Sequence, residues 1–69
     1  MDVGAAVKEI RMKSLLSQND FAHEIGVSFS TVNRWETGKA TPSFKALKKI
    51  KDYCAHNQID FSIERRTAE

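Results

Sequence analysis

The sequence predicts an all-α protein, folded as a compact bundle of four to five helices. Three observations support this fold class. Apolar residues recur at spacings of three and four, which is the period of one face of an α-helix. Three glycines and one proline are the main helix-breaking residues, and they divide this pattern into short segments. At 69 residues, the chain has room for a single domain with one core.

The first three helices are defined by apolar stripes and by the residues that flank them. We predict the first helix over residues 3–14. The second begins after Ser17, whose hydroxyl can accept a bond from a free N–H of the first turn. It ends at Gly26, where the turn requires a positive φ. The third begins at another capping residue, Ser28, and ends at Thr37.

A fourth helix is expected after the loop that follows Gly38. Proline suits the first position of a helix, so Pro42 predicts its start, with Thr41 as the cap. We expect this helix to end near Asn57. Lysines occupy much of its surface, and its predicted apolar face carries Phe44, Leu47, Ile50 and Cys54.

The conformation of the last residues is left open by the sequence. Ile59, Phe61 and Ile63 alternate with polar residues, which is the period of a half-buried strand. A lone strand leaves its backbone unpaired, so it would need a partner, such as the same segment of a second chain. The alternative, which we favour, is an irregular segment or short helix that covers the end of the core. We therefore expect a helical domain over 1–58 and a dimerisation or core-capping tail over 59–69.

Composition argues against an enzyme and against a metal site. Eleven basic and nine acidic residues give a net charge of +2, so the total charge is weak evidence for a nucleic-acid partner. A single cysteine, Cys54, excludes an internal disulfide and the common paired Cys/His zinc patterns. So small a chain has little room for an enclosed pocket, and no nucleophile, base and orienting group converge. We expect no catalysis, no cofactor and no metal.

The location of the protein is predicted from what the chain lacks. No apolar run approaches the ~18 residues that are needed to span a bilayer. The first residues lack the basic start and apolar stretch of a signal peptide. We therefore expect a cytoplasmic protein without membrane contact.

The most informative stretch is residues 18–37, which is predicted to be a helix, a tight turn and a second helix. Three positions suit this arrangement. Ala22 is small enough for the helices to cross closely, Gly26 permits the turn, and the branched Val32 can pack the second helix on the first. The combination is more specific than any one residue, and further apolar residues accompany it at Phe21, Ile25 and Trp35.

This segment resembles the Cro/lambda-repressor-like, or xenobiotic-response-element, family of helix-turn-helix DNA-binding proteins. The likeness extends from about Val7 to Cys54. It implies a lambda-repressor-like DNA-binding domain in which the third helix enters the major groove. The residues that carry it are Ser17-Gln18, Phe21-Ala22, Ile25-Gly26-Val27-Ser28, Glu36-x-Gly38-Lys39 and Pro42.

The resemblance implies three sets of functional residues. One is a structural pair, Arg11 with Glu36, which in relatives joins the first helix to the end of the third. The positions that match DNA phosphate contacts are Ser17, Gln18, Thr37 and Lys39. The positions that match base contacts are Ser28, Phe29, Ser30, Asn33 and Arg34.

The chemistry of the base-contact positions suits a DNA reader. Arg34 can donate two parallel bonds to guanine, and Ser30 can donate or accept. Asn33 can pair with adenine, or with a phosphate if it points sideways. Phe29 can contact a thymine methyl; the alternative is a core or dimer residue. The family often has glycine where this chain has Leu15, and a left-handed conformation there would cost about 1 kcal/mol.

The function that the resemblance implies is sequence-specific binding of double-stranded DNA by a small transcriptional regulator. We expect a homodimer whose recognition helices are about 34 Å apart. The alternative is an antitoxin-like or regulatory protein-interaction module that uses the same fold and binds a protein partner through residues 59–69.

Overall fold

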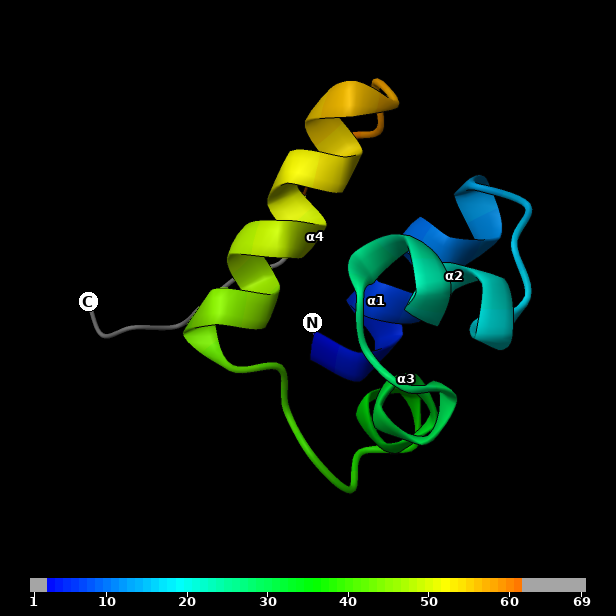
Figure 1. Cartoon of the computed structure of the whole chain (residues 1–69), viewed down its shortest axis with the longest axis vertical. Coiled ribbons are helices and arrows are strands. Elements are labelled where there is room, and N and C mark those ends of the chain that lie inside the picture. Colours follow the sequence, from blue (N-terminus) through cyan, green and yellow to red (C-terminus); the bar gives the residue numbers. More distant parts are fainter. Residues whose placement is uncertain (1–2, 62–69) are drawn as a thin grey trace.

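The computed structural model describes residues 3–61, and within this range the chain is helical with no strand. The helices are α1 (Val3–Lys13), α2 (Gln18–Ile25), α3 (Phe29–Glu36) and α4 (Phe44–His56). They agree in number with the lower end of the predicted range, and the all-α fold class is confirmed (Figure 1).

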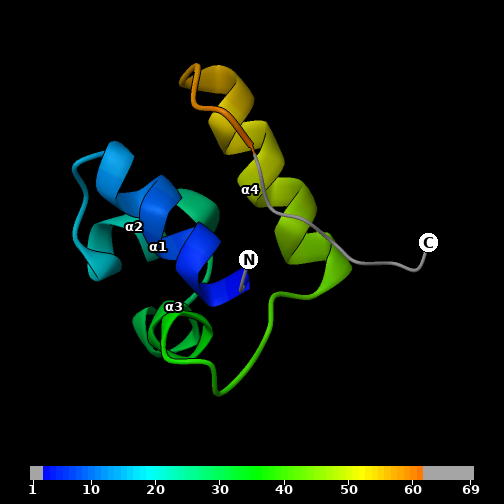
Figure 2. The same ribbon diagram turned by 180° about the vertical axis from the view of Figure 1, so that it is seen from behind.

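The helices surround one apolar core. α3 packs against both α1 and α2, and α4 packs against α2. In Figures 1 and 2, α4 lies alongside the group formed by α1, α2 and α3. The rings of Phe21 and Tyr53 meet edge to face with their centroids 5.7 Å apart, which ties α2 to α4. The largest fully buried side chains are Phe21, Ile50, Val7, Val32 and Cys54.

Local capping sets the boundaries of α2 and α3 as the sequence predicts. The Ser17 hydroxyl accepts a bond from the N–H of Asp20 at 3.0 Å. Gly26 ends α2 with φ of +87°, and its N–H donates to the Ala22 carbonyl at 2.8 Å. The Ser28 hydroxyl then starts α3 by accepting from the N–H of Thr31 at 3.1 Å. Only three residues, Gly26, Val27 and Ser28, therefore separate α2 from α3.

The predicted start of α4 was wrong by two residues. The cap is Ser43, whose hydroxyl accepts from the N–H of Ala46 at 3.1 Å, and not Thr41. Pro42 is buried ahead of the helix instead of occupying its first position. A serine directly after the proline offers a cap with a free hydroxyl, and this shifts the helix start along the chain.

The predicted apolar face of α4 was wrong at Phe44. Its side chain is 76% exposed, whereas the buried residues of this helix are Ala46, Ile50 and Cys54. Phe44 precedes Ile50 by six residues, which turns it about 240° around the helix axis, away from the core. Ala46 completes the buried stripe because it lies one helical turn before Ile50.

After α4 the chain folds back onto the core. Gln58 adopts a left-handed φ of +56°, and the N–H of Ile59 donates to the Cys54 carbonyl at 2.8 Å. Ile59 and Phe61 then pack against the core as irregular chain. Residues 59–61 thus follow the core-capping alternative, while Ile63 lies outside the described residues.

Cys54 is buried in this core. Burial raises the pKa of its thiol, and the nearby carboxylate of Asp60 raises it further. The thiol therefore behaves as an apolar core group. None of the helices in residues 3–61 is long and apolar enough to cross a membrane.

Candidate nucleic-acid interface

The helix α3 has one buried side and one exposed side. Val32 and Trp35 are buried against the rest of the domain, three residues apart as one helix face requires. Ser28 at the start of the helix and Phe29, Ser30 and Arg34 within it are exposed, and Asn33 is half-buried. Four of the five predicted base-contact residues are therefore open to solvent.

The start of α3 is organised by serine and threonine hydroxyls. Besides capping the helix, the Ser28 hydroxyl lies 2.8 Å from that of Thr31 and 3.2 Å from that of Ser30. The side chain of Phe29 is 48% exposed, so it is not a core residue. This end of the helix presents an apolar ring between small hydroxyl groups.

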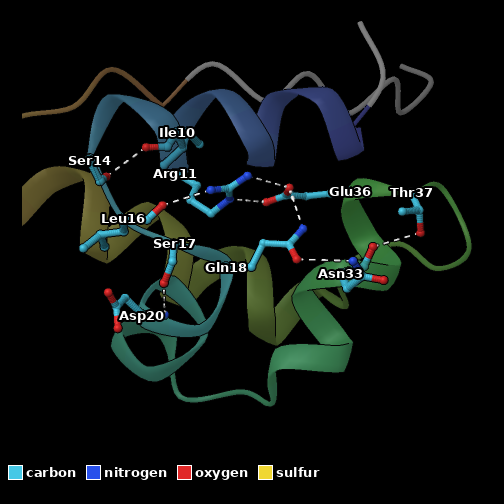
Figure 3. A network of polar contacts seen from close by, with 10 residues as sticks. All are labelled: Ile10, Arg11, Ser14, Leu16, Ser17, Gln18, Asp20, Asn33, Glu36 and Thr37. Atoms are coloured by element: carbon cyan, nitrogen blue, oxygen red, sulfur yellow. Dashed lines mark hydrogen bonds and ion pairs between the residues drawn. The ribbon is translucent and has the colours of Figure 1, made fainter.

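The end of α3 is held by the Arg11–Glu36 ion pair (Figure 3). Arg11 Nε donates to Glu36 Oε2 at 2.7 Å, and Nη2 donates to Oε1 at 3.1 Å. A further bond runs from Arg11 Nη1 to the carbonyl of Leu16 at 2.9 Å. The Arg11 and Glu36 side chains are 15% and 4% exposed, so water screens this pair weakly. The pair fixes α3 to α1 and to the chain that enters α2.

Both pKa values in this pair are shifted toward the charged forms. The hydrogen bonds to Glu36 raise the pKa of Arg11 above its ordinary value, against the opposing effect of burial. For Glu36, burial alone would raise the pKa, but the bonds from Arg11 and Gln18 and the Arg11 charge outweigh it. The pKa of Glu36 is therefore lower than usual, and the carboxyl is ionised at neutral pH.

Gln18 extends this network from α2 to the exposed side of α3. Its Nε2 donates to Glu36 Oε1 at 3.0 Å, and its Oε1 accepts from Asn33 Nδ2 at 3.2 Å. Figure 3 shows the resulting row of side chains, from Arg11 through Glu36 and Gln18 to Asn33. Sequence reasoning named these four residues but did not predict that Gln18 and Asn33 are in contact.

The remaining predicted phosphate contacts lie at the two helix ends that border this network. Ser17 is exposed at the start of α2, and Thr37 and Lys39 are exposed after α3. The Thr37 hydroxyl donates to the Asn33 carbonyl at 2.9 Å. The N–H of Lys39 donates to the Arg34 carbonyl at 2.9 Å, which anchors the backbone of this lysine beside the exposed side of α3.

Leu15, which stands where the family often has glycine, adopts a left-handed backbone conformation. Its φ is +59°, and its side chain is 92% exposed. The turn before α2 thus keeps the backbone shape that glycine serves best, although this chain carries a branched side chain there.

Comparison with known families matches residues 7–54 to a helix-turn-helix domain, which is more than half of the chain. The chain belongs to the Cro/C1-type helix-turn-helix family. It is a helix-turn-helix DNA-binding domain, of a family that is typically non-enzymatic. The matched residues include α2, α3 and the ion pair that positions this Cro/C1-type unit.

One curated relative is Multiprotein-bridging factor 1 of Debaryomyces hansenii, which is 34% identical to this Cro/C1-type chain over 50 residues. The match covers 72% of this chain and 33% of the relative. The chain thus spans about a third of the length of that relative. No solved structure gave a significant match.

Proposed function

We propose that this protein binds double-stranded DNA sequence-specifically as a small transcriptional regulator, with α3 in the major groove. The observation that carries the proposal is the side of α3 formed by Ser28, Phe29, Ser30 and Arg34. It is exposed in a domain whose family binds DNA. A helix of this width fits the major groove, where base edges are distinguishable.

The individual roles follow from the chemistry of each position. Arg34 is the guanine reader, because its guanidinium matches the O6 and N7 acceptors. Phe29 contacts a thymine methyl, and the hydroxyls beside it bond to neighbouring base edges. The phosphate contacts at the two helix ends set the register of the domain on the duplex. They are Ser17, Gln18, Thr37 and Lys39.

Gln18 contacts a phosphate through its backbone in this proposal. Both ends of its side-chain amide already bond to Glu36 and Asn33. Its backbone N–H lies at the first residue of α2, where the helix dipole favours an anion. The backbone can therefore hold the phosphate while the side chain stays in the network.

The functional form that we propose is a cytoplasmic homodimer on a palindromic site. Two copies would place their recognition helices about 34 Å apart, on successive faces of the major groove. A shallow apolar groove along α4 offers a surface for the second copy. It is lined by Phe44, Leu47, Lys48, Lys51 and Phe61.

Selection of bound sites from random DNA duplexes tests the DNA-binding proposal. The protein should enrich one sequence, and Arg34→Ala should relax the preference at one base pair while costing about 1–3 kcal/mol of binding free energy. Arg34→Lys is the matched control. It keeps the charge but loses the paired donors, so it should relax the same base pair with a smaller loss of affinity.

Two results would contradict this proposal. The first is that the protein enriches no sequence, although its circular dichroism spectrum shows that it is folded. The other is an unchanged site preference in both Arg34 variants, which would show that this side of α3 does not contact base edges.

The second candidate function is a regulatory or antitoxin-like module that binds another protein. Phe44, which is exposed and lines the apolar groove on α4, favours it, as does the name of the relative, a multiprotein-bridging factor. A stable complex with a purified partner that is lost in Phe44→Ser but kept in Arg34→Ala would support this candidate. The same complex surviving Phe44→Ser would exclude the groove.

A further inference from the structure

We infer that Glu36 sets the direction of the hydrogen bonds through Gln18 to Asn33. Asn33 then presents its carbonyl oxygen to DNA and reads the exocyclic amino group of adenine, or less strongly of cytosine. This inference rests on the proposed binding of α3 in the major groove. It assigns Asn33 as a specificity-determining residue, with Gln18 and Glu36 as positioning residues.

The direction begins at an acceptor that cannot reverse its role. An ionised carboxylate has no proton to donate, so the Gln18 amide must turn its Nε2 toward Glu36. The observed bond from Nε2 to Oε1 is 3.0 Å long. A flipped Gln18 amide would place an oxygen against the carboxylate, which is repulsive. Because Glu36 is nearly buried and paired with Arg11, it does not swing away to relieve that repulsion.

The orientation of Gln18 then determines that of Asn33. With Nε2 on Glu36, the other end of the Gln18 amide is its oxygen, which needs a donor. Asn33 supplies one through Nδ2 at 3.2 Å. The Asn33 amide is therefore oriented by a carboxylate that it does not itself contact.

The oxygen of Asn33 is left for another partner. In Figure 3, the Asn33 amide nitrogen points toward Gln18, and its side-chain oxygen points away. No hydrogen bond within residues 3–61 reaches this oxygen, and no side-chain polar atom in this range is both buried and unpaired. The oxygen is therefore not fully buried, on a half-buried residue next to the exposed Arg34.

An outward carbonyl oxygen discriminates among the groups that DNA offers. It repels phosphate oxygens and the acceptors O6 and N7 of guanine and O4 of thymine. It accepts from the amino groups of adenine N6 and cytosine N4. Adenine is favoured because its N7 can also accept the remaining N–H of Asn33. The network thus decides between the two roles open to Asn33 from sequence alone, and selects a base rather than a phosphate.

The first experiment compares binding of the protein to the selected DNA site and to the same site without one amino group. At the base pair that depends on Asn33, adenine is replaced by purine, which lacks the 6-amino group. The natural protein should bind the purine duplex about tenfold more weakly. Asn33→Ala should bind both duplexes equally, and should lose preference at this base pair alone.

The second experiment removes the positioning amide. Gln18→Leu keeps the size of the side chain but frees the Asn33 amide to rotate, so the preference for adenine at this base pair should be lost and the purine duplex should bind as well as the adenine duplex. A purely structural or phosphate role of Gln18 would weaken all sequences alike and leave this preference unchanged. Asn19→Leu makes a similar change one residue away on the exposed surface of α2, and should leave every base preference intact.

Three outcomes would overturn the inference. They are equal binding of the adenine and purine duplexes by the natural protein, no position that depends on Asn33, and an unchanged preference there in Gln18→Leu. Each outcome can be told apart from failure of the proposed function. If the proposed function fails, the protein selects no sequence at all. If only this inference fails, the protein still selects a site that depends on Arg34.

Discussion

Leu15 shows that a single residue can hold a strained backbone without an offsetting contact in the core. Its φ of +59° lies in the left-handed region, and its side chain is 92% exposed. The cost of about 1 kcal/mol for a residue with a Cβ is therefore offset by the rest of the fold. Residues on both sides are fixed, because the turn lies between α1 and the cap at Ser17.

Leu15→Gly should stabilise the domain by about 0.5–1 kcal/mol. The free energy gained by removing the left-handed strain exceeds the entropic cost of ordering a glycine, which is more flexible in the unfolded chain. Little buried apolar area is lost. Urea unfolding measures the change as a shift in midpoint at constant slope. Leu15→Ala removes the same exposed side chain but keeps the Cβ, so it should give no such gain. Equal stability of the two variants would contradict the strain argument.

The Arg11–Glu36 pair predicts strong coupling between two residues. Glu36→Gln leaves the guanidinium of Arg11 shielded without its counter-charge, and should cost about 3 kcal/mol of unfolding free energy at neutral pH. Arg11→Met should cost a similar amount for the reverse reason. The double variant Arg11→Met, Glu36→Leu should lose less than the sum of the two, as measured by a double-mutant cycle in urea. Additive losses would contradict the coupling.

The same pair predicts a pH dependence. The folded pKa of Glu36 is below its ordinary value of 4.5, so the ionised carboxylate stabilises the fold. This contribution is complete above pH 4.5 and is lost as the pH falls through the lower folded pKa. Unfolding free energies followed from neutral pH to about pH 3 should fall more steeply for the natural protein than for Glu36→Gln. Parallel pH profiles would show that Glu36 is not a source of the acid sensitivity.

At the scale of elements, the boundaries of α2 and α3 could be predicted from sequence. Ser17, Gly26 and Ser28 were expected as caps, and the structure uses all of them. At α4, Thr41 and Ser43 flank a proline, and the structure uses Ser43 as the cap and buries Pro42 ahead of the helix. With one candidate cap on each side of the proline, the local sequence leaves the start of this helix open.

For the candidate site, the exposed side of α3 could be predicted from sequence, but the contact between α2 and α3 could not. Burial of Val32 and Trp35 fixes which side of α3 is exposed, and both follow from periodicity. The contact between Gln18 and Asn33 depends on how closely α2 and α3 cross, since the residues are far apart in sequence. Periodicity gives the face of each helix but not the register of one helix on another.

The corrected start of α4 can be tested at the level of this element. Ser43→Ala removes the acceptor for the N–H of Ala46, and should cost about 1 kcal/mol of unfolding free energy. Thr41→Ala is the control, because Thr41 is exposed and outside the helix, and it should change stability by less than about 0.5 kcal/mol. A larger loss in Thr41→Ala than in Ser43→Ala would restore the earlier boundary.

At the scale of the whole molecule, charge placement matters more than total charge. A net charge of +2 attracts DNA weakly, so phosphate binding must come from cations that stand beside the exposed side of α3. Lys39 is such a cation, since its backbone is bonded to Arg34 at the end of that helix. The lysines of α4 include Lys48 and Lys51, which line the apolar groove beside Phe61.

Lys39→Ala should therefore weaken binding to all DNA sequences alike and lower the slope of log affinity against log salt by about one. Fluorescence anisotropy across a salt series, on the selected duplex and on an unrelated one, measures both effects. Lys51→Ala removes the same charge from the molecule at the groove on α4. On a duplex with a single half-site, where contacts between two copies play no part, it should leave the slope nearly unchanged. Equal losses of slope in the two variants would mean that DNA responds to overall charge. A changed preference at one base pair in Lys39→Ala would instead make Lys39 a base contact, because a phosphate contact carries no sequence information.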